Sequence, residues 1–183
     1  MPDLALTNTL ASYGTLLLLF GTALSLGALA GMRIPTSLAR ILARYGLALA
    51  AALSAFAVTL TLYYSEVLGQ APCSLCWVQR VFLYPQVLLF GIAALRSDTR
   101  IVLYTTALSL VGAVTALYHH ALQVGGISLA PCAATGPQCT EVTFLTWGFI
   151  TFPFMAFALF VFLIAFTALL TTLWQRFPQA KDA

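Results

Sequence analysis

Charged side chains are scarce in this chain: 8 lysines and arginines and 5 acidic residues occur among 183 residues, which is 7%. A water-soluble domain carries roughly a quarter of its residues as charged side chains. Hydrophobic residues make up 61% of the chain, and the mean hydropathy is +0.97. These values exclude a soluble globular domain and predict an integral membrane protein, surrounded by the lipid bilayer and without a nucleic-acid partner.

Long polar segments are also missing, so the sequence has no room for a soluble domain. A membrane-spanning helix needs about 20 mostly apolar residues, and five stretches meet this requirement: 10–31, 41–64, 75–95, 101–122 and 149–174. The connections are short, except for the segment between the fourth and fifth spans. The predicted fold is an all-α transmembrane bundle with five spans.

The chain lacks a basic segment before its first apolar stretch, since only Asp3 is charged there. The apolar run is also longer than the roughly 7–15 residues of a secretory signal core. We therefore expect residues 10–31 to be a retained helix, although Ala28 and Ala30 have the spacing of a cleavage site.

Basic residues fall almost entirely on one side of the predicted membrane. They lie between spans one and two, between spans three and four, and after span five: Arg33, Arg40, Arg44, Arg96, Arg100, Arg176 and Lys181. Cytoplasmic loops are enriched in lysine and arginine. The amino terminus is therefore predicted outside and the carboxyl terminus in the cytoplasm.

Aromatic residues gather near the predicted outer ends of the spans. This group contains Tyr63, Tyr64, Trp77, Tyr118 and Trp147. Such residues are typical of the belt at a membrane surface, and we interpret most of them as anchors.

All four cysteines lie in the predicted outer segments, and the first two form the motif Cys73-Ser-Leu-Cys76. Pro72 precedes them and is suited to a helix start, where its missing N–H costs nothing. Both thiols then lie in the first helical turn. Unpaired N–H groups and the positive helix end favour a thiolate there and lower its pKa below the free value of about 8.5.

Arg80 departs from the pattern of basic residues, because it lies inside the third span. A cation inside the membrane is costly unless it has a partner or a function, although an arginine near the surface can also extend to the headgroups. Arg80 follows Cys76 by four residues, which puts both side chains on one helix face. Gln79 also lies close to this face, so Arg80 and Gln79 are candidates for binding a lipid-soluble electron acceptor beside the thiol.

The second pair, Cys132 and Cys139, lies in a loop that also contains Pro131, Gly136 and Pro137. These residues favour turns and irregular structure. A disulfide between the two cysteines is expected to be exposed and within reach of another protein. Thiol–disulfide exchange requires such access for the attacking thiolate.

Taken together, these motifs resemble the DsbB/BdbC family of disulfide-formation proteins. The resemblance rests on Cys-Ser-Leu-Cys-Trp-Val-Gln-Arg at 73–80, Tyr-His-His-Ala-Leu-Gln at 118–123, the later cysteine pair, and Trp-Gly-Phe-Ile-Thr-Phe-Pro at 147–153. It covers residues 41–175 and implies that they form a four-helix catalytic core. Residues 1–40 are then an extra transmembrane helix with a cytoplasmic loop, and residues 176–183 a cytoplasmic tail.

The resemblance implies a thiol oxidase of the bacterial cytoplasmic membrane, with both cysteine pairs outside. Such a protein takes electrons from an extracytoplasmic thioredoxin-like oxidase of the DsbA or BdbD type and passes them to a membrane quinone. By position, Cys132 forms the mixed disulfide with the partner, Cys139 exchanges with Cys73, and Cys76 lies next to the quinone with Arg80. The short spacing of the second pair is closer to the BdbC branch, which favours menaquinone over ubiquinone.

Two adjacent histidines, His119 and His120, lie at the predicted outer end of the fourth span. Either is compatible with a structural role at the interface. The resemblance adds a second role, binding the quinone or delivering protons to it, because an imidazole titrates at about pH 6.5. His119 fits the family pattern better, since it lies four residues before Gln123.

Three other interpretations fit parts of the pattern. The four cysteines can form a structural zinc site, although an oxidising exterior favours disulfides. A vitamin K epoxide reductase-like enzyme also carries C-x-x-C on a membrane helix bundle, but its loop pair precedes that motif. A structural protein with two disulfides leaves Arg80 without a purpose.

Overall fold

The computed structural model of the protein describes residues 4–126 and 137–178. Five helices in these residues are long and apolar enough to cross a membrane: α1 (Leu4–Leu29), α2 (Thr36–Leu62), α3 (Ser74–Arg96), α4 (Ile101–Gly125) and α5 (Phe152–Arg176). A π-helical turn, η1 (Tyr63–Val67), extends α2. The predicted all-α membrane bundle is confirmed, and α1 begins earlier than the predicted residue 10.

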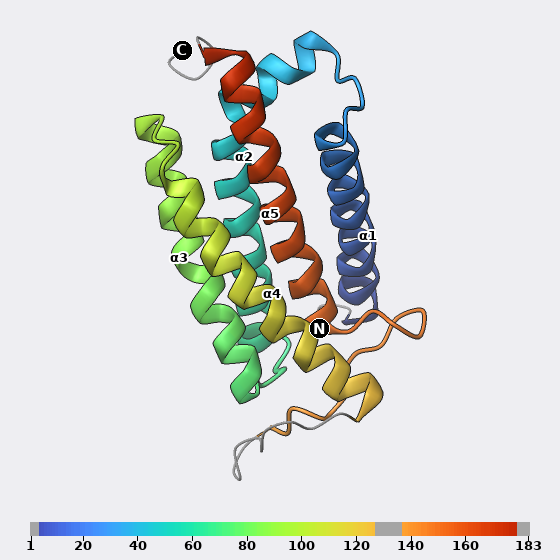
Figure 1. Ribbon diagram of the computed structural model, residues 1–183. Coiled ribbons are helices and arrows are strands. Elements are labelled where there is room, and N and C mark those ends of the chain that lie inside the picture. The colour runs from blue at the N-terminus through green and yellow to red at the C-terminus, as the bar shows by residue number, and fades with distance from the viewer. Residues whose placement is uncertain (1–3, 127–136, 179–183) are drawn as a thin grey trace.

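The connections divide between the two ends of the bundle. Figure 1 shows the α1–α2 and α3–α4 connections at the end where α5 finishes, while the start of α1, the η1–α3 connection and the chain before α5 lie at the opposite end. At the first end, the guanidinium of Arg40 lies 5.8 Å from the ring centroid of Phe177. The arginines of the two connections therefore share one end with Arg176, which is the arrangement that the charge pattern predicts.

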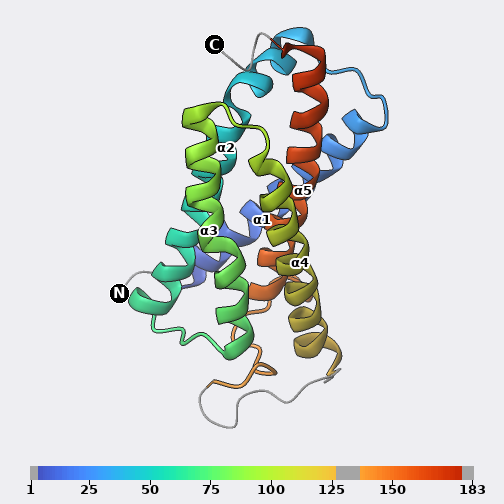
Figure 2. The ribbon, with the colours of Figure 1, turned by 60° about the vertical axis from the view of Figure 1, so that its left-hand side comes forward.

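Helix α1 lies outside the other four helices and runs obliquely across them (Figure 2). It packs against α5. Its buried side chains are all small hydroxyl residues, Ser12, Thr15, Thr22 and Ser25, and each hydroxyl donates to the carbonyl four residues earlier. Small residues let membrane helices approach closely.

Helices α2 to α5 form the core of the bundle, in which α5 contacts both α2 and α4 and carries the largest set of buried side chains. A buried polar pair joins α3 to α4: the Ser109 hydroxyl donates to Gln86 Oε1 over 3.2 Å. Such interhelical hydrogen bonds contribute about 0.6 kcal/mol on average in a membrane protein. The core therefore holds the start of α3 and the end of α4 side by side, which positions the cysteines and histidines described below.

Helix α5 begins at Phe152, slightly later than the predicted residue 149. Thr151 is its N-cap, and the Thr151 hydroxyl accepts from the Phe154 N–H over 3.3 Å. Pro153 lies in the first turn, where a proline removes no helical hydrogen bond. This capped start fixes the chain that enters the bundle from the second cysteine pair.

Candidate active site

The first cysteine pair marks the start of α3. Cys73 is the N-cap residue, with extended backbone angles, and the helix begins at Ser74. Both Cys73 and Cys76 are free thiols, and Cys73 Sγ donates to Cys76 Sγ over 3.3 Å. The two sulfurs are thus neighbours at a helix start, as the motif predicts, with Pro72 just before the cap.

The predicted lowering of the pKa is wrong for Cys73. The hydrogen bond that Cys73 donates to Cys76 stabilises the protonated thiol, and burial adds to this effect, so the pKa of Cys73 is raised to about 11. A thiol that donates a hydrogen bond is stabilised in its neutral form. For Cys73 this effect outweighs the lowering of the pKa that a helix start favours. The pair is therefore unequal, with Cys73 as the protonated donor and Cys76 as the acceptor.

His119 links the first cysteine pair to the second. Its ring is completely buried, and its Nδ1 lies 3.0 Å from Gln79 Nε2. Because an amide nitrogen only donates, Nδ1 is the accepting nitrogen and the ring proton lies on Nε2. That Nε2 is 3.6 Å from Cys73 Sγ and 3.2 Å from the Cys139 carbonyl oxygen, so one N–H group faces both cysteines.

Cys139 is fully buried, in contrast to the exposed loop cysteine that the sequence predicts. It packs in one apolar cluster with Cys73 and Leu122, and its Sγ lies 3.4 Å from the Ser74 hydroxyl. The reason is that the chain after residue 137 folds back against the start of α3. Its partner in the predicted pair, Cys132, lies outside the described residues.

Arg80 lies one turn beyond Cys76 and is buried, with 8% of its surface exposed. Its Nη2 donates to the Thr61 carbonyl over 3.0 Å, and its guanidinium lies 5.1 Å from the ring centroid of Trp77. Arg80 therefore has a partner within the protein, the Thr61 carbonyl, as expected for a cation inside a span. The π-turn η1 begins two residues after Thr61, and such turns are frequent at functional sites.

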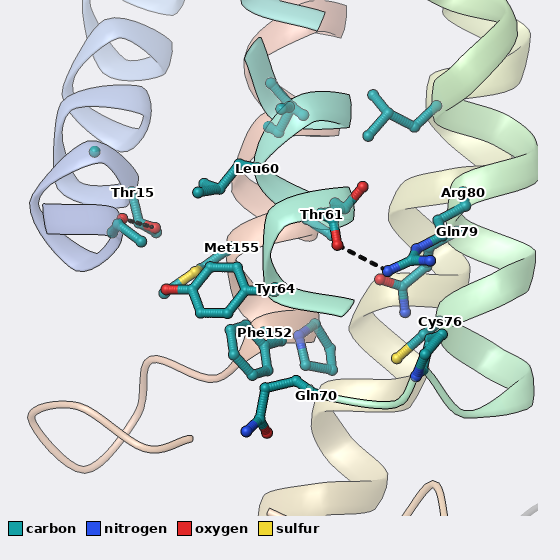
Figure 3. A pocket seen from close by; sticks show the side chains of 18 of the residues that line it. Thr15, Leu60, Thr61, Tyr64, Gln70, Cys76, Gln79, Arg80, Phe152 and Met155 are labelled. Atoms are coloured by element: carbon teal, nitrogen blue, oxygen red, sulfur yellow. Dashed lines mark hydrogen bonds between the residues drawn. The ribbon is translucent and has the colours of Figure 1, made fainter. Parts of the chain in front are cut away.

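A cavity of about 920 Å³ lies beside these residues. Figure 3 shows Cys76, Gln79 and Arg80 on α3 at one side of it and Thr15 of α1 at the other. Between these sides the walls come mainly from apolar residues of α1, α2 and α5. Ligand pockets in proteins typically have volumes of about 300–1,000 Å³, so the cavity is large enough for a sizeable apolar molecule.

Three potential metal ligands also meet at this site. The sulfurs of Cys73 and Cys76 and a ring nitrogen of His119 all lie within 4.8 Å of one another. Thiolate sulfur and imidazole nitrogen are the usual ligands of zinc. The four-cysteine zinc site considered from the sequence also needs Cys132, which lies outside the described residues.

His120 points away from the cysteines. Its Nδ1 lies 2.9 Å from the hydroxyl of Thr151, the N-cap of α5, and its ring packs on Phe154 at a centroid distance of 5.0 Å. The family pattern favours His119 over His120, but the sequence does not decide between the two histidines. The structure brings His119 to the thiols and gives His120 a contact with the start of α5.

Sequence reasoning missed the position of Tyr64, which it assigned to the aromatic belt. Tyr64 is 6% exposed, lines the cavity and donates its hydroxyl to Asn8 Oδ1 over 2.9 Å. Gln123, also on the cavity wall, has a buried Oε1 that accepts no hydrogen bond from the described residues. The Tyr64–Asn8 pair joins elements 56 residues apart, so local sequence spacing gives no signal for it.

The fold and the site define a class of protein: a multi-pass membrane protein that carries a dithiol at a helix start, beside an apolar cavity. The model of the disulfide bond formation protein DsbB family matches residues 43–170. The chain therefore belongs to this family, which implies thiol–disulfide oxidoreductase chemistry. The matched region spans α2 to α5 and leaves α1 outside.

Individual relatives agree with this assignment and confirm the expected likeness to the BdbC branch. Disulfide bond formation protein C of Bacillus subtilis is 40% identical over 112 residues, which cover 60% of this chain and 80% of the relative. Probable disulfide formation protein C 1 of Bacillus cereus is 41% identical over 110 residues, covering 59% and 79%. A probable disulfide formation protein of Metapseudomonas resinovorans is 42% identical over 105 residues, covering 56% and 72%. No solved structure matches the chain significantly.

Proposed function

We propose that this protein oxidises a thioredoxin-like dithiol protein outside the membrane and passes the two electrons to a membrane quinone. The observation that supports this most strongly is the meeting of Cys73, Cys76, Cys139 and His119 at one end of a cavity whose other walls are apolar. Water-borne thiols and a lipid-soluble acceptor need such a junction to react with each other. The proposal extends the disulfide-forming activity of the family to a donor and an acceptor.

The relay begins with the second cysteine pair. A thiolate of the partner attacks Cys132 of a Cys132–Cys139 disulfide and releases the Cys139 thiolate, and the partner's second thiolate then displaces Cys132. The partner leaves with a new disulfide, and the pair holds two more electrons than before. The burial of Cys139 against the start of α3 supports a role in the inward transfer rather than in contact with the partner.

The second exchange moves the electrons to the cavity. The Cys139 thiolate attacks Cys73 of a Cys73–Cys76 disulfide, which breaks that bond and frees the Cys76 thiolate. Cys132 then attacks Cys139, so the outer disulfide re-forms and Cys73 is left as a thiol. The His119 N–H, 3.6 Å from Cys73 Sγ, is placed to stabilise negative charge on that sulfur and to hand over a proton.

The cavity end next to Cys76 fits a quinone headgroup. When bound, a quinone supplies an acceptor for two electrons and two protons, and its carbonyl oxygens become more negative as it is reduced. Arg80 has five N–H donors, and its Nη2 is fixed by the Thr61 carbonyl, so the cation is oriented before any ligand arrives. Fixed donors of this kind stabilise developing negative charge in a low-dielectric site, while Cys73 and Cys76 re-form their disulfide.

The orientation in the membrane follows from the arginines. Both connections that carry them lie at the end of the bundle opposite the cysteines (Figure 1), and lysine and arginine favour the cytoplasmic side. We therefore place the cysteines and the amino terminus outside the bacterial cytoplasmic membrane. A DsbA- or BdbD-type oxidase is the partner class that this placement suits, and menaquinone the favoured quinone.

The test combines purified protein, a reduced thioredoxin-like partner and a water-soluble quinone, with quinone absorbance as the readout. The wild type should consume quinone in step with oxidation of the partner, whereas Cys76→Ser should not. Leu88→Ala, at an exposed position of α3 that does not line the cavity, serves as the control. Quinone consumption that continues without Cys76 contradicts the proposal.

The cluster of Cys73, Cys76 and His119 favours one second candidate, a bound zinc ion. A structural zinc site predicts metal in the purified protein at a ratio near one per chain and no thiol-dependent turnover. Metal analysis of the active preparation separates the two functions, because a zinc-bound dithiol cannot form the disulfide that the relay requires.

A further inference from the structure

Helix α1 forms a wall of the cavity although it lies outside the region that matches the family. The family match begins at residue 43, and α1 ends at Leu29. Nevertheless, Leu10, Gly14 and Leu18 of α1 line the same cavity as Cys76 and Arg80. The helix therefore adds a surface to the site that the four-helix core alone does not have.

The cavity occupies the space between α1 and α2. Helix α1 packs on α5 rather than on α2, so the two walls stand apart. Leu10 and Leu17 on α1 and Phe56 on α2 line the cavity and are 63%, 71% and 65% exposed. These exposed apolar residues lie within membrane-spanning helices, so the rim of the cavity opens toward the bilayer.

The cavity is long as well as wide. Its lining residues on α2 and η1 run from Leu49 to Tyr64, a distance of about 22 Å at a rise of about 1.5 Å per residue. The hydrocarbon core of a bilayer is about 30 Å thick, so the cavity follows most of its depth. A ring headgroup at Cys76 fills only the thiol end of such a space.

Polar groups are concentrated near the thiol end. Cys73, Cys76, Gln79 and Arg80 of the α3 start lie there, whereas the opposite half is lined by residues such as Leu49 and Leu53 of α2. Figure 3 shows Tyr64 between Thr15 of α1 and Cys76 of α3. Tyr64 thus lies between the α1 side of the cavity and the thiol side, and its hydroxyl donates a hydrogen bond to Asn8 of α1.

We propose that the part of the cavity between α1 and α2 binds the polyprenyl side chain of the quinone. The quinone enters this part from the bilayer. This inference rests on the proposed quinone reductase function and adds the site for the tail. Because lipid chains are as apolar as the cavity walls, transfer from the bilayer supplies no hydrophobic driving force. The contribution of α1 is shape: it holds the tail in one path and so directs the headgroup toward Cys76 and Arg80.

Gly14 offers a direct test, because it lines the cavity and a Cβ built there meets no atom within 4 Å. Gly14→Phe should place a ring in the tail path, attached through a Cβ that meets no neighbouring atom. Gly91 on α3 is the matched control: a Cβ there also meets no atom within 4 Å, but the residue does not line the cavity. Gly91→Phe adds the same side chain to another membrane-spanning helix.

The measurement is kcat/KM for a quinone with several isoprene units divided by kcat/KM for the same quinone without a side chain. Gly14→Phe should lower this ratio at least tenfold relative to wild type, and Gly91→Phe should keep it within twofold. Ala11 lines the same cavity wall, so Ala11→Phe should also lower the ratio and replaces Gly14→Phe if the latter is poorly folded. An unchanged ratio in both cavity variants overturns the tail site.

A photoreactive group at the end of the isoprene chain gives a second readout. It should label peptides of α1 in the wild type and lose this labelling in Gly14→Phe. Labelling of the lipid-facing side of α3 instead contradicts the proposal. Loss of α1 labelling on addition of phospholipid, but not of unlabelled quinone, also contradicts it, because it identifies an acyl chain as the occupant. If the wild type reduces neither quinone in a Cys76-dependent manner, the proposed function itself fails, which is a different outcome.

Discussion

The Nε2 of His119 lies 3.6 Å from the sulfur of Cys73, at the point where Cys73 and Cys139 pack together. The same nitrogen is 3.2 Å from the carbonyl oxygen of Cys139. Gln79 fixes the ring from the opposite side by occupying Nδ1. A single buried imidazole therefore contacts both Cys73 and Cys139, the two residues between which the proposed relay passes electrons.

The two histidines should respond differently to substitution. His119→Gln should slow reoxidation of the outer cysteine pair by about 10²-fold, since a positioned acid or base contributes about 10²–10⁴-fold. His120→Gln should retain the rate but lower the thermal unfolding temperature, because His120 bonds to Thr151 and packs on Phe154 at the start of α5. Single-turnover kinetics and thermal unfolding of both variants check this pair, and equal rate losses would contradict the assignment of His119.

Arg80 should act on the quinone step and not on the partner step. Arg80→Gln should reduce quinone reduction by about 10²-fold, as does loss of one preorganised donor at a developing negative charge. Arg80→Lys should lie between wild type and Arg80→Gln, because lysine keeps the charge but lacks the planar donor geometry. Formation of the mixed disulfide with the partner, followed without quinone, is the control; a comparable loss in that step argues for misfolding.

The raised pKa of Cys73 predicts an unusual pH profile for its alkylation. Below its pKa, the thiolate fraction of a thiol rises tenfold per pH unit, so Cys73 in the reduced protein should react ever faster up to pH ~10. The cause is the hydrogen bond to Cys76 together with burial, which puts the pKa near 11. An ordinary thiol reaches its plateau above pH ~8.5.

Mass spectrometry of the Cys73 peptide after brief exposure to a small maleimide measures this profile. The same peptide in protein unfolded with detergent should show the plateau of an ordinary thiol. A plateau below pH 9 in the folded protein would show that Cys73 does not hold its proton through Cys76.

Cys73 and Cys139 should form a disulfide directly when their usual partners are removed. The double variant Cys76→Ser and Cys132→Ser leaves these two thiols, which pack in one cluster. Mild oxidation should join them faster than it joins Cys76 to Cys139 in the variant Cys73→Ser and Cys132→Ser. Peptide mapping under non-reducing conditions gives both rates, and a faster Cys76–Cys139 bond would reverse the order of the relay.

The sequence predicts the five spans and the C-x-x-C helix start because both depend on local patterns. Twenty apolar residues define a span wherever they occur, and the cysteine spacing fixes which thiols share a turn. The burial of Arg80 follows less directly, since its charge inside a span indicates a partner but not which one. The partner is the Thr61 carbonyl of another helix, which only the packing of α2 on α3 reveals.

Other features of the site depend on contacts between distant segments. Tyr64 has the sequence context of a belt residue, but it is buried, and its hydroxyl donates a hydrogen bond to Asn8 of α1. Cys139 lies in a polar, turn-rich segment, yet the fold buries it against Cys73. The pKa of Cys73 depends on which thiol of the pair donates, and this is a matter of side-chain geometry rather than of helix position.

The most direct test of the account is the stoichiometry of the reaction under strictly anaerobic conditions. Reduced thioredoxin-like partner, membrane quinone and catalytic amounts of the protein are mixed, and partner disulfide and quinol are both quantified over time. The account predicts one quinol for each partner disulfide, with neither product formed by Cys76→Ser. Partner disulfide that accumulates without quinol, or at the same rate when quinone is omitted, would contradict it.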